Sequence, residues 1–128
     1  MSTRSLIGKY EGNRIKAIYC HFDGYPSGVG EMLKENYTSE DKINKLLSLG
    51  DISFLEKEVE PKEGQEHSFD HKAEGVTVAY HRDRGEDLVI RYFGDENEYM
   101  KDSVIDYYYL WKDNSWHLSN GLHEFINF

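Results

Sequence analysis

The residues from Tyr19 to Gly30 constrain this chain more than any other stretch. They gather the only cysteine, one histidine, one carboxylate and three glycines into the run Tyr-Cys-His-Phe-Asp-Gly-Tyr-Pro-Ser-Gly-Val-Gly. Glycine, proline and aspartate each favour sharp turns for a different physical reason. The residues before the run alternate as in a strand, and those after it recur at helical spacing. The run is therefore predicted to turn a strand into a helix, either as a working site or as a structural corner.

Two strands are predicted before this run. Residues 3–10 and 14–22 should pair as a hairpin, because Gly12 and Asn13 tolerate the positive φ of a tight turn. In the second strand, alternation separates one face with Ile15, Ala17 and Tyr19 from another with Arg14, Lys16, Ile18, Cys20 and Phe22. The second face changes from charged to apolar along the strand, so the strand should enter the core near His21.

Two helices are predicted after the run. Val29, Leu33 and Tyr37 recur every four residues, which indicates a short amphipathic helix. The next helix should cover residues 40–49, with Thr38 or Ser39 as its N-cap and Gly50 ending it in a left-handed conformation.

The second half of the chain is predicted to be sheet after an exposed, glutamate-rich loop at residues 56–66. Four strands are expected, centred on residues 76–80, 88–92, 104–111 and 116–118. Residues 82–86 should link the first two as a hairpin loop, and Asp113-Asn114 should link the last two. The predicted fold is one α+β domain over residues 1–128, with a mostly antiparallel sheet and two helices inserted after the second strand.

The net charge of the chain limits the classes of partner that it can bind. The net charge is −9, and residues 1–22 carry +3, so the remainder carries −12. Such an acidic surface repels phosphate backbones, which excludes direct nucleic-acid binding and suits a protein partner with a basic surface. One cysteine rules out an internal disulfide and is typical of a reducing compartment. No apolar stretch is long enough to span a bilayer and no signal peptide is evident, so a cytoplasmic protein without a membrane partner is expected.

His21 and Asp23 are the strongest candidates for catalysis. They are two residues apart at a strand end, so their side chains could share a side and orient an imidazole for acid–base chemistry or bind a metal. The alternative is a turn in which both are satisfied locally. Cys20 is adjacent to His21 and therefore faces away from it, which favours a buried apolar cysteine over a nucleophile.

A small anionic ligand is the second hypothesis for the same run. Gly28 and Gly30 begin a helix, where free backbone N–H groups can bind a phosphate or carboxylate. Nearby candidates to assist are His21, Asp23, Tyr25, Arg4 and Lys16. The alternative is that the glycines only allow the chain to turn. No cofactor is predicted, and His67, Asp70 and His71 fit a surface loop better than a metal site.

Two further segments are candidates for partner contact. Arg82, Asp83 and Arg84 lie at the tip of the predicted hairpin, where they would be exposed. Tyr107, Tyr109 and their neighbours place aromatic rings on both faces of one strand, which suits an interface or a homo-oligomer unless the chain covers both faces.

The chain resembles a family of small proteins of phages, prophages and other bacterial mobile elements. The resemblance rests on residues 2–8 (STRSLIG), residues 18–30 (IYCHFDGYPSGVG) and Tyr37, with residues 109–116 similar to the closing hairpin of the family. It covers the first forty residues well and the others loosely, and it implies no catalytic residue. The implied setting is an accessory gene, and such genes often encode inhibitors of host defence, including anti-CRISPR proteins.

The sequence thus predicts a non-enzymatic protein that binds and inhibits a host protein. A small-ligand protein built around residues 23–30 is the first alternative, and an enzyme centred on His21 and Asp23 is the second.

Overall fold

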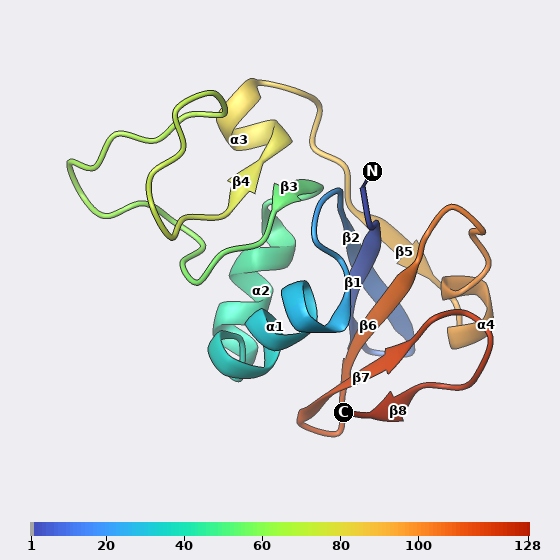
Figure 1. Ribbon diagram of the computed structural model, residues 1–128. Helices are drawn as coiled ribbons and strands as arrows, with labels where there is room; N and C mark the ends of the chain where they lie inside the picture. Colours follow the sequence, from blue (N-terminus) through green and yellow to red (C-terminus); the bar gives the residue numbers. More distant parts are fainter. Residues whose placement is uncertain (1) are drawn as a thin grey trace.

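One mixed β-sheet organises the chain (Figure 1). The structure is a computed structural model that describes residues 2–128, and those residues form an eight-stranded sheet. The strand order is β4-β3-β2-β1-β6-β7-β8, and β5 pairs with β2 off this path. The strands are β1 Ser5–Glu11, β2 Arg14–Cys20, β3 Ile52–Phe54, β4 Val78–Ala79, β5 Arg91–Phe93, β6 Tyr107–Lys112, β7 Ser115–Ser119 and β8 Ile126–Asn127.

The helices are short. One turn of π-helix, η1, runs over Pro26–Gly30 and continues directly into α1, Glu31–Asn36; α2 spans Glu40–Ser48, α3 Tyr80–Arg84 and α4 Glu96–Tyr99. The prediction for α2 is confirmed in detail, because the Ser39 side chain accepts a hydrogen bond from the Lys42 N–H and Gly50 follows with a φ of 74°. A capped helix of this length is a local feature, and local features are the ones a sequence specifies most directly.

The prediction of helices combined with one sheet is confirmed, but the sheet is mixed and not mostly antiparallel. β1 pairs antiparallel to β2 and parallel to β6, while β2 pairs parallel to β3 and antiparallel to β5. The helices are not confined to one insertion after the second strand, because η1, α1 and α2 follow β2 whereas α3 follows β4 and α4 follows β5. Parallel pairing needs a long connection between the strands, so local hairpin signals could not reveal it.

The hairpin predicted between residues 76–80 and 88–92 is wrong. β4 pairs with β3, and β5 pairs with β2, so the two segments join different strands. The predicted hairpin tip is instead α3, which ends at Gly85 with a φ of 76°. The strand at this point shortens to Val78–Ala79 because Tyr80 already begins the helix.

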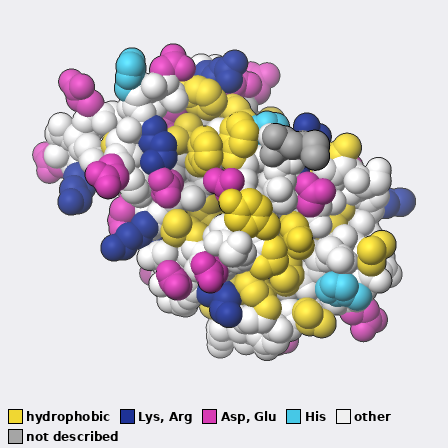
Figure 2. Space-filling view, in the orientation of Figure 1, with side chains coloured by type: hydrophobic (Ala, Val, Ile, Leu, Met, Phe, Trp, Pro, Cys, Tyr) yellow, Lys and Arg dark blue, Asp and Glu magenta, His cyan; other side chains and the backbone are white. Residues whose placement is uncertain are grey.

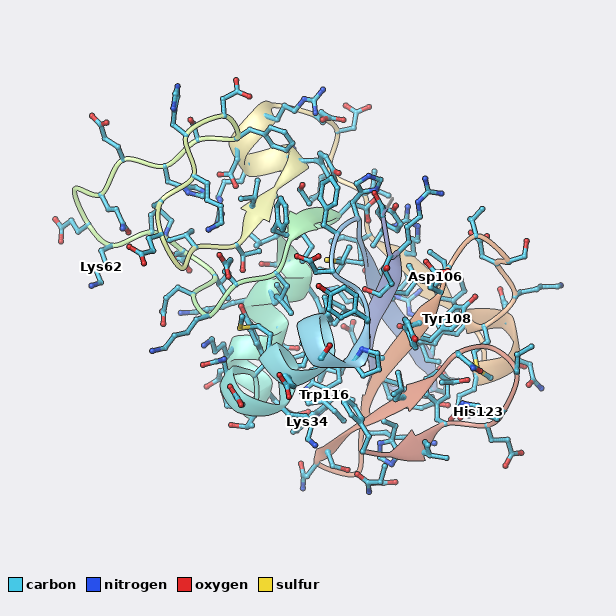
Figure 3. All side chains as sticks on the ribbon, in the orientation of Figure 1. Lys34, Lys62, Asp106, Tyr108, Trp116 and His123 are labelled. Atoms are coloured by element: carbon cyan, nitrogen blue, oxygen red, sulfur yellow. The ribbon has the colours of Figure 1, made fainter. Side chains whose placement is uncertain are left out.

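The sheet is covered on both faces, which gives the chain two cores. On one face, α1 and α2 pack over a cluster that includes Ile7, Ile18 and Trp116. On the other face, the cluster includes Leu6 and Tyr108 together with Tyr99 of α4 and Phe125 of the C-terminal tail. Figure 3 shows Trp116 on the side of α1 and Tyr108 on the side of α4. The predicted alternation in β2 is confirmed, since Ile15 and Ala17 belong to the second cluster and Ile18 and Cys20 to the first.

A long loop leads from β3 to β4 and extends away from the sheet (Figure 1). The predicted glutamate-rich loop at residues 56–66 is confirmed as irregular and largely exposed, and Lys62 points outward near its tip in Figure 3. No helix within residues 2–128 is long and apolar enough to cross a membrane.

Candidate functional site

The run from Tyr19 to Gly30 begins as an extension of β2. After β2 ends at Cys20, the His21 N–H still donates to the Ile52 carbonyl at 3.1 Å and the Phe22 N–H to the Ser53 carbonyl at 3.0 Å. Asp23 then adopts a φ of 57°, a left-handed conformation that aspartate tolerates better than most residues. The chain therefore leaves the sheet abruptly between Phe22 and Gly24.

Gly24 is held by two distant parts of the chain. Its N–H donates to the Thr3 carbonyl at 2.9 Å, and its own carbonyl accepts from the Tyr109 hydroxyl at 2.7 Å. A Cβ at this position would lie 2.8 Å from the Thr3 oxygen. The close approach of the two backbones explains the glycine without any ligand.

Gly28 and Gly30 are not free anion donors. The Gly28 N–H donates to the Tyr25 carbonyl at 2.9 Å, and the Gly30 N–H reaches the same oxygen at 3.4 Å. A Cβ at Gly28 would lie only 2.4 Å from the Asp23 carbonyl oxygen. Packing of η1 against the preceding turn thus accounts for the glycine at position 28, and the N–H groups already have acceptors.

Cys20 is a buried apolar residue. Its side chain is fully buried, and its Sγ lies 3.4 Å from the Phe22 carbonyl. Burial raises the pKa of the thiol to about 12, although hydrogen bonds to the backbone act in the opposite direction. The thiolate needed for nucleophilic attack is therefore negligible near neutral pH.

His21 joins a side-chain network with Tyr19, which lies on the sheet face opposite α1 and α2. Its Nδ1 lies 2.7 Å from the Tyr19 hydroxyl and its Nε2 lies 3.2 Å from the Ser2 hydroxyl. Its ring also makes an edge contact with the Phe22 ring, with centroids 4.5 Å apart. Both ring nitrogens thus have partners, and neither partner is Asp23.

Asp23 is exposed and accepts a hydrogen bond from the Tyr25 hydroxyl at 3.2 Å. This bond, together with the negative charge of Asp23, raises the pKa of the Tyr25 hydroxyl. Within residues 2–128, no hydrogen bond or ion pair joins His21 to Asp23. The two candidates for acid–base chemistry therefore have separate partners.

A groove of about 460 Å³ lies beside the run, between η1, α1 and the residues that follow β3. Its apolar walls are Phe22, Val29, Met32, Phe54 and Leu55. The Phe22 and Phe54 rings stack with centroids 4.7 Å apart and are both half-buried, so part of the pair faces solvent. The groove has the exposed aromatic surface that protein interfaces favour.

Carboxylates line the same groove, which we call the acidic groove. They are Asp23, Glu31, Glu35 and Glu56, and Lys57 is the one cation among the lining residues. Glu56 pairs with Lys72 at 2.5 Å, whereas the other three form no ion pair within residues 2–128. On the face that Figure 2 shows, apolar surface crosses the molecule with acidic side chains beside it.

Arg4 and Lys16 do not join this groove. Arg4 lines a pocket on the opposite face of the sheet together with Tyr19. Lys16 lies in the part of β2 near the hairpin turn, where its Nζ is 3.8 Å from Glu11 Oε2. The structure therefore separates the two basic residues from Tyr25, Gly28 and the rest of the predicted anion site.

The segment predicted as an exposed polar tip is exposed only in part, because Arg82 and Asp83 are half-buried while residues 84–86 are exposed. The Asp83 side chain is 4% exposed and accepts from Arg82 at 2.8 Å and from the Ala79 N–H at 2.8 Å. Arg82 also donates to the carbonyls of Val59 and Thr77. Of the three predicted contact residues in α3, Arg84 is the one with an exposed side chain, and it pairs with Glu86.

The predicted aromatic surface of β6 is covered by the chain itself. Tyr109 is fully buried under Gly30, and Tyr108 is buried on the opposite face. Tyr107 is half-buried against the core on the side of the helices. α1 and α2 cover one face, and α4 together with Phe125 covers the other, so a second subunit is not needed to bury the rings.

The sequence did carry a signal for the acidic groove that the predictions missed. Glu31 and Glu35 are four residues apart in a predicted helix and therefore lie on one face of it. Phe54 gave no such signal, because its contact with Phe22 depends on the parallel pairing of β3 with β2.

Comparisons with protein-family models, curated proteins and solved structures found no match. Within residues 2–128, no group of three or more His, Cys, Asp or Glu side chains is arranged to hold a metal.

Proposed function

We propose that this protein is a non-enzymatic accessory protein of a phage or mobile element that binds and inhibits a host protein through its acidic groove. An inhibitor of host defence, of which anti-CRISPR proteins are one type, is the role that the resemblance of residues 2–8 and 18–30 supports. The observation that carries the binding proposal is the stacked Phe22–Phe54 pair, partly exposed beside three carboxylates that form no ion pair with residues 2–128.

The groove favours a basic partner segment. Asp23, Glu31 and Glu35 repel one another, and a Lys or Arg side chain would relieve that repulsion. The aliphatic stem of such a side chain would lie over Phe22 and Phe54, and a guanidinium also gains from the face of an aromatic ring. Interfaces are dominated by a few anchors of this kind surrounded by weaker contacts.

Charge reversal in the groove tests this proposal. We expect the double variant Glu31→Lys and Glu35→Lys to lose a bacterial protein that the wild type retains from a lysate. The matched control is Glu63→Lys with Glu66→Lys, which makes the same change of charge on the exposed loop. A partner lost equally by both variants would indicate a general charge effect and contradict a groove.

The purified partner completes the test. We expect its affinity for the wild type to fall as salt is raised from 50 to 500 mM, because screening weakens exposed charge pairs. The activity of the partner should decrease in proportion to added protein and reach its minimum near equimolar ratio. Salt-independent binding would remove charge as the cause, and inhibition at a small fraction of equimolar protein would indicate an enzyme instead.

A further inference from the structure

A second concave site lies on the sheet face opposite the acidic groove. It is a pocket of about 390 Å³, which we call the Tyr19 pocket. Its apolar walls are Leu6, Phe93, Val104 and Ile105, and its polar walls are Tyr19, Arg4, Arg91 and Asp102. The volume is within the range of small-molecule sites, which are mostly apolar with a few polar groups.

The two arginines of the pocket differ in their partners. Arg91 forms an ion pair with Asp51, whose carboxylate also accepts the Tyr19 N–H at 3.0 Å. Arg4 has no ion pair and no side-chain hydrogen bond within residues 2–128. The Arg4 guanidinium is therefore the positive charge in this pocket that remains available to a ligand.

Tyr19 is fixed between these groups. Its hydroxyl lies 2.7 Å from His21 Nδ1, and the Arg91 guanidinium lies 5.6 Å from its ring centroid. Burial raises the pKa of the Tyr19 hydroxyl, and the nearby charge of Arg4 opposes that rise. The ring thus offers a rigid, neutral wall close to the free guanidinium.

Asp102 limits the kind of anion that fits. One of its carboxylate oxygens accepts the Val104 N–H at 3.0 Å, and it makes no ion pair with Arg4. A carboxylate in the wall repels molecules with several negative charges. The same carboxylate favours a ligand that carries an N–H donor as well as its anionic group.

We propose that the Tyr19 pocket binds a small organic anion with a flat apolar body, one negatively charged group and an N–H donor. Arg4 binds the anionic group, the body lies against Leu6, Phe93 and Ile105, and Asp102 accepts the N–H. Inorganic anions alone do not suit the site, because the apolar walls would remain exposed to water. The inference concerns the opposite face from the acidic groove and does not depend on the proposed inhibition.

The dye 1-anilinonaphthalene-8-sulfonate is a suitable probe, because it combines a flat aromatic body, one sulfonate and one N–H. We expect one molecule of dye to bind per chain with a rise in fluorescence. Arg4→Gln should weaken this binding at least about tenfold, the usual loss when a hydrogen-bonded charge is removed. The neutral analogue N-phenyl-1-naphthylamine should bind wild type and Arg4→Gln equally.

Two further variants keep the test decisive. Val104→Glu adds a negative charge at a half-exposed pocket wall and should weaken the dye as Arg4→Gln does. Arg14→Gln removes an arginine from the same sheet outside the pocket and should leave binding unchanged. Equal dye affinity in wild type and both pocket variants, each with a native melting temperature, would overturn the proposal.

Competition distinguishes the source of the anion. Indole-3-acetate at millimolar concentration should displace the dye if the natural ligand is a carboxylate, and adenosine 5′-monophosphate should displace it if the ligand is a phosphate. Displacement by neither compound would overturn a biological role for the pocket.

Discussion

The hydrogen in place of a side chain at Gly28 allows the turn after β2 to close. The position has no left-handed φ, so the need for glycine comes from contact alone. The nearest atom to a Cβ there is a backbone oxygen, which cannot move without opening the turn. This contact explains why the turn after β2 needs a glycine at position 28.

Gly28→Ala is therefore expected to destabilise the protein by about 2 kcal/mol, the range that overpacking against a rigid neighbour produces. Urea unfolding at pH 7 measures the loss. Gly94→Ala is the matched control, because its nearest atom, at 3.0 Å, is the end of the Glu98 side chain, which can move. Equal stability of the two variants would show that the turn at residues 23–28 relaxes more easily than its contacts imply.

Also for single residues, the sequence predicted well which face of the sheet a side chain occupies. It predicted poorly which side chains from distant segments meet in space. The facing of Ile15 and Ala17 against Ile18 and Cys20 follows from the period of two in a strand, and the structure confirms it. The meeting of Tyr19 with Arg91 depends on β5 taking the edge of β2. No local pattern contains that choice, so the pocket could not be predicted.

Among the elements, α3 holds the long loop between β3 and β4, a role that its amino-acid composition does not indicate. His67 in the long loop is 2% exposed by side chain, and its Nε2 lies 3.1 Å from Asp83. The His67 Nδ1 accepts the Ala73 N–H at 3.0 Å, so its Nε2 is the atom that donates to the carboxylate. Together with Arg82, these contacts fasten the loop between β3 and β4 to α3.

Asp83→Asn should loosen this attachment and cost about 2 kcal/mol at pH 7, because it leaves Arg82 and His67 without their charged partner. Urea unfolding measures the loss, and limited proteolysis should cleave the loop faster. Asp70→Asn is the matched control on the same loop, since Asp70 is exposed. Slow cleavage of the Asp83 variant would contradict the assigned attachment.

The loss of stability in the same variant should depend on pH. Burial alone would raise the pKa of Asp83, but hydrogen bonds from Arg82, the Ala79 N–H and His67 outweigh it and hold the pKa below its ordinary value of 3.8. The ionised group therefore stabilises the fold fully above that ordinary value, and the stabilisation disappears as the pH falls through the lower folded value. The stability difference between wild type and Asp83→Asn should accordingly shrink from pH 7 to pH 3.

The elements that could be predicted from the sequence are the long ones and those with clear cap or turn residues. The nine-residue α2 and the hairpin through Asp113 and Asn114 were predicted, and both turn residues have the positive φ that the hairpin needs. β3, β4 and β5 have at most three residues each, and their partners are set by the whole sheet. Strands this short carry too little periodicity to assign a neighbour.

Across the whole molecule, protection from solvent should decrease from the centre of the sheet to its edges. β1 lies between β2 and β6 with both long pairings intact, whereas β8 is a two-residue edge strand whose residues are exposed. Amide hydrogen exchange is therefore expected to be orders of magnitude slower in β1 than in β8. Equal exchange in the two strands would show that the sheet opens as one unit and contradict this gradient.

The parallel pair of β1 and β6 has a consequence for synthesis on the ribosome. Ser5 pairs with Tyr107 and Lys9 with Trp111, so one side of β1 stays without its partner until residues 107–111 have been translated. An open strand edge is a template for pairing with other chains, and non-local pairings are slow to form. A nascent chain that stalls before residue 107 would present that edge to its neighbours, and rapid completion of translation should therefore favour yield.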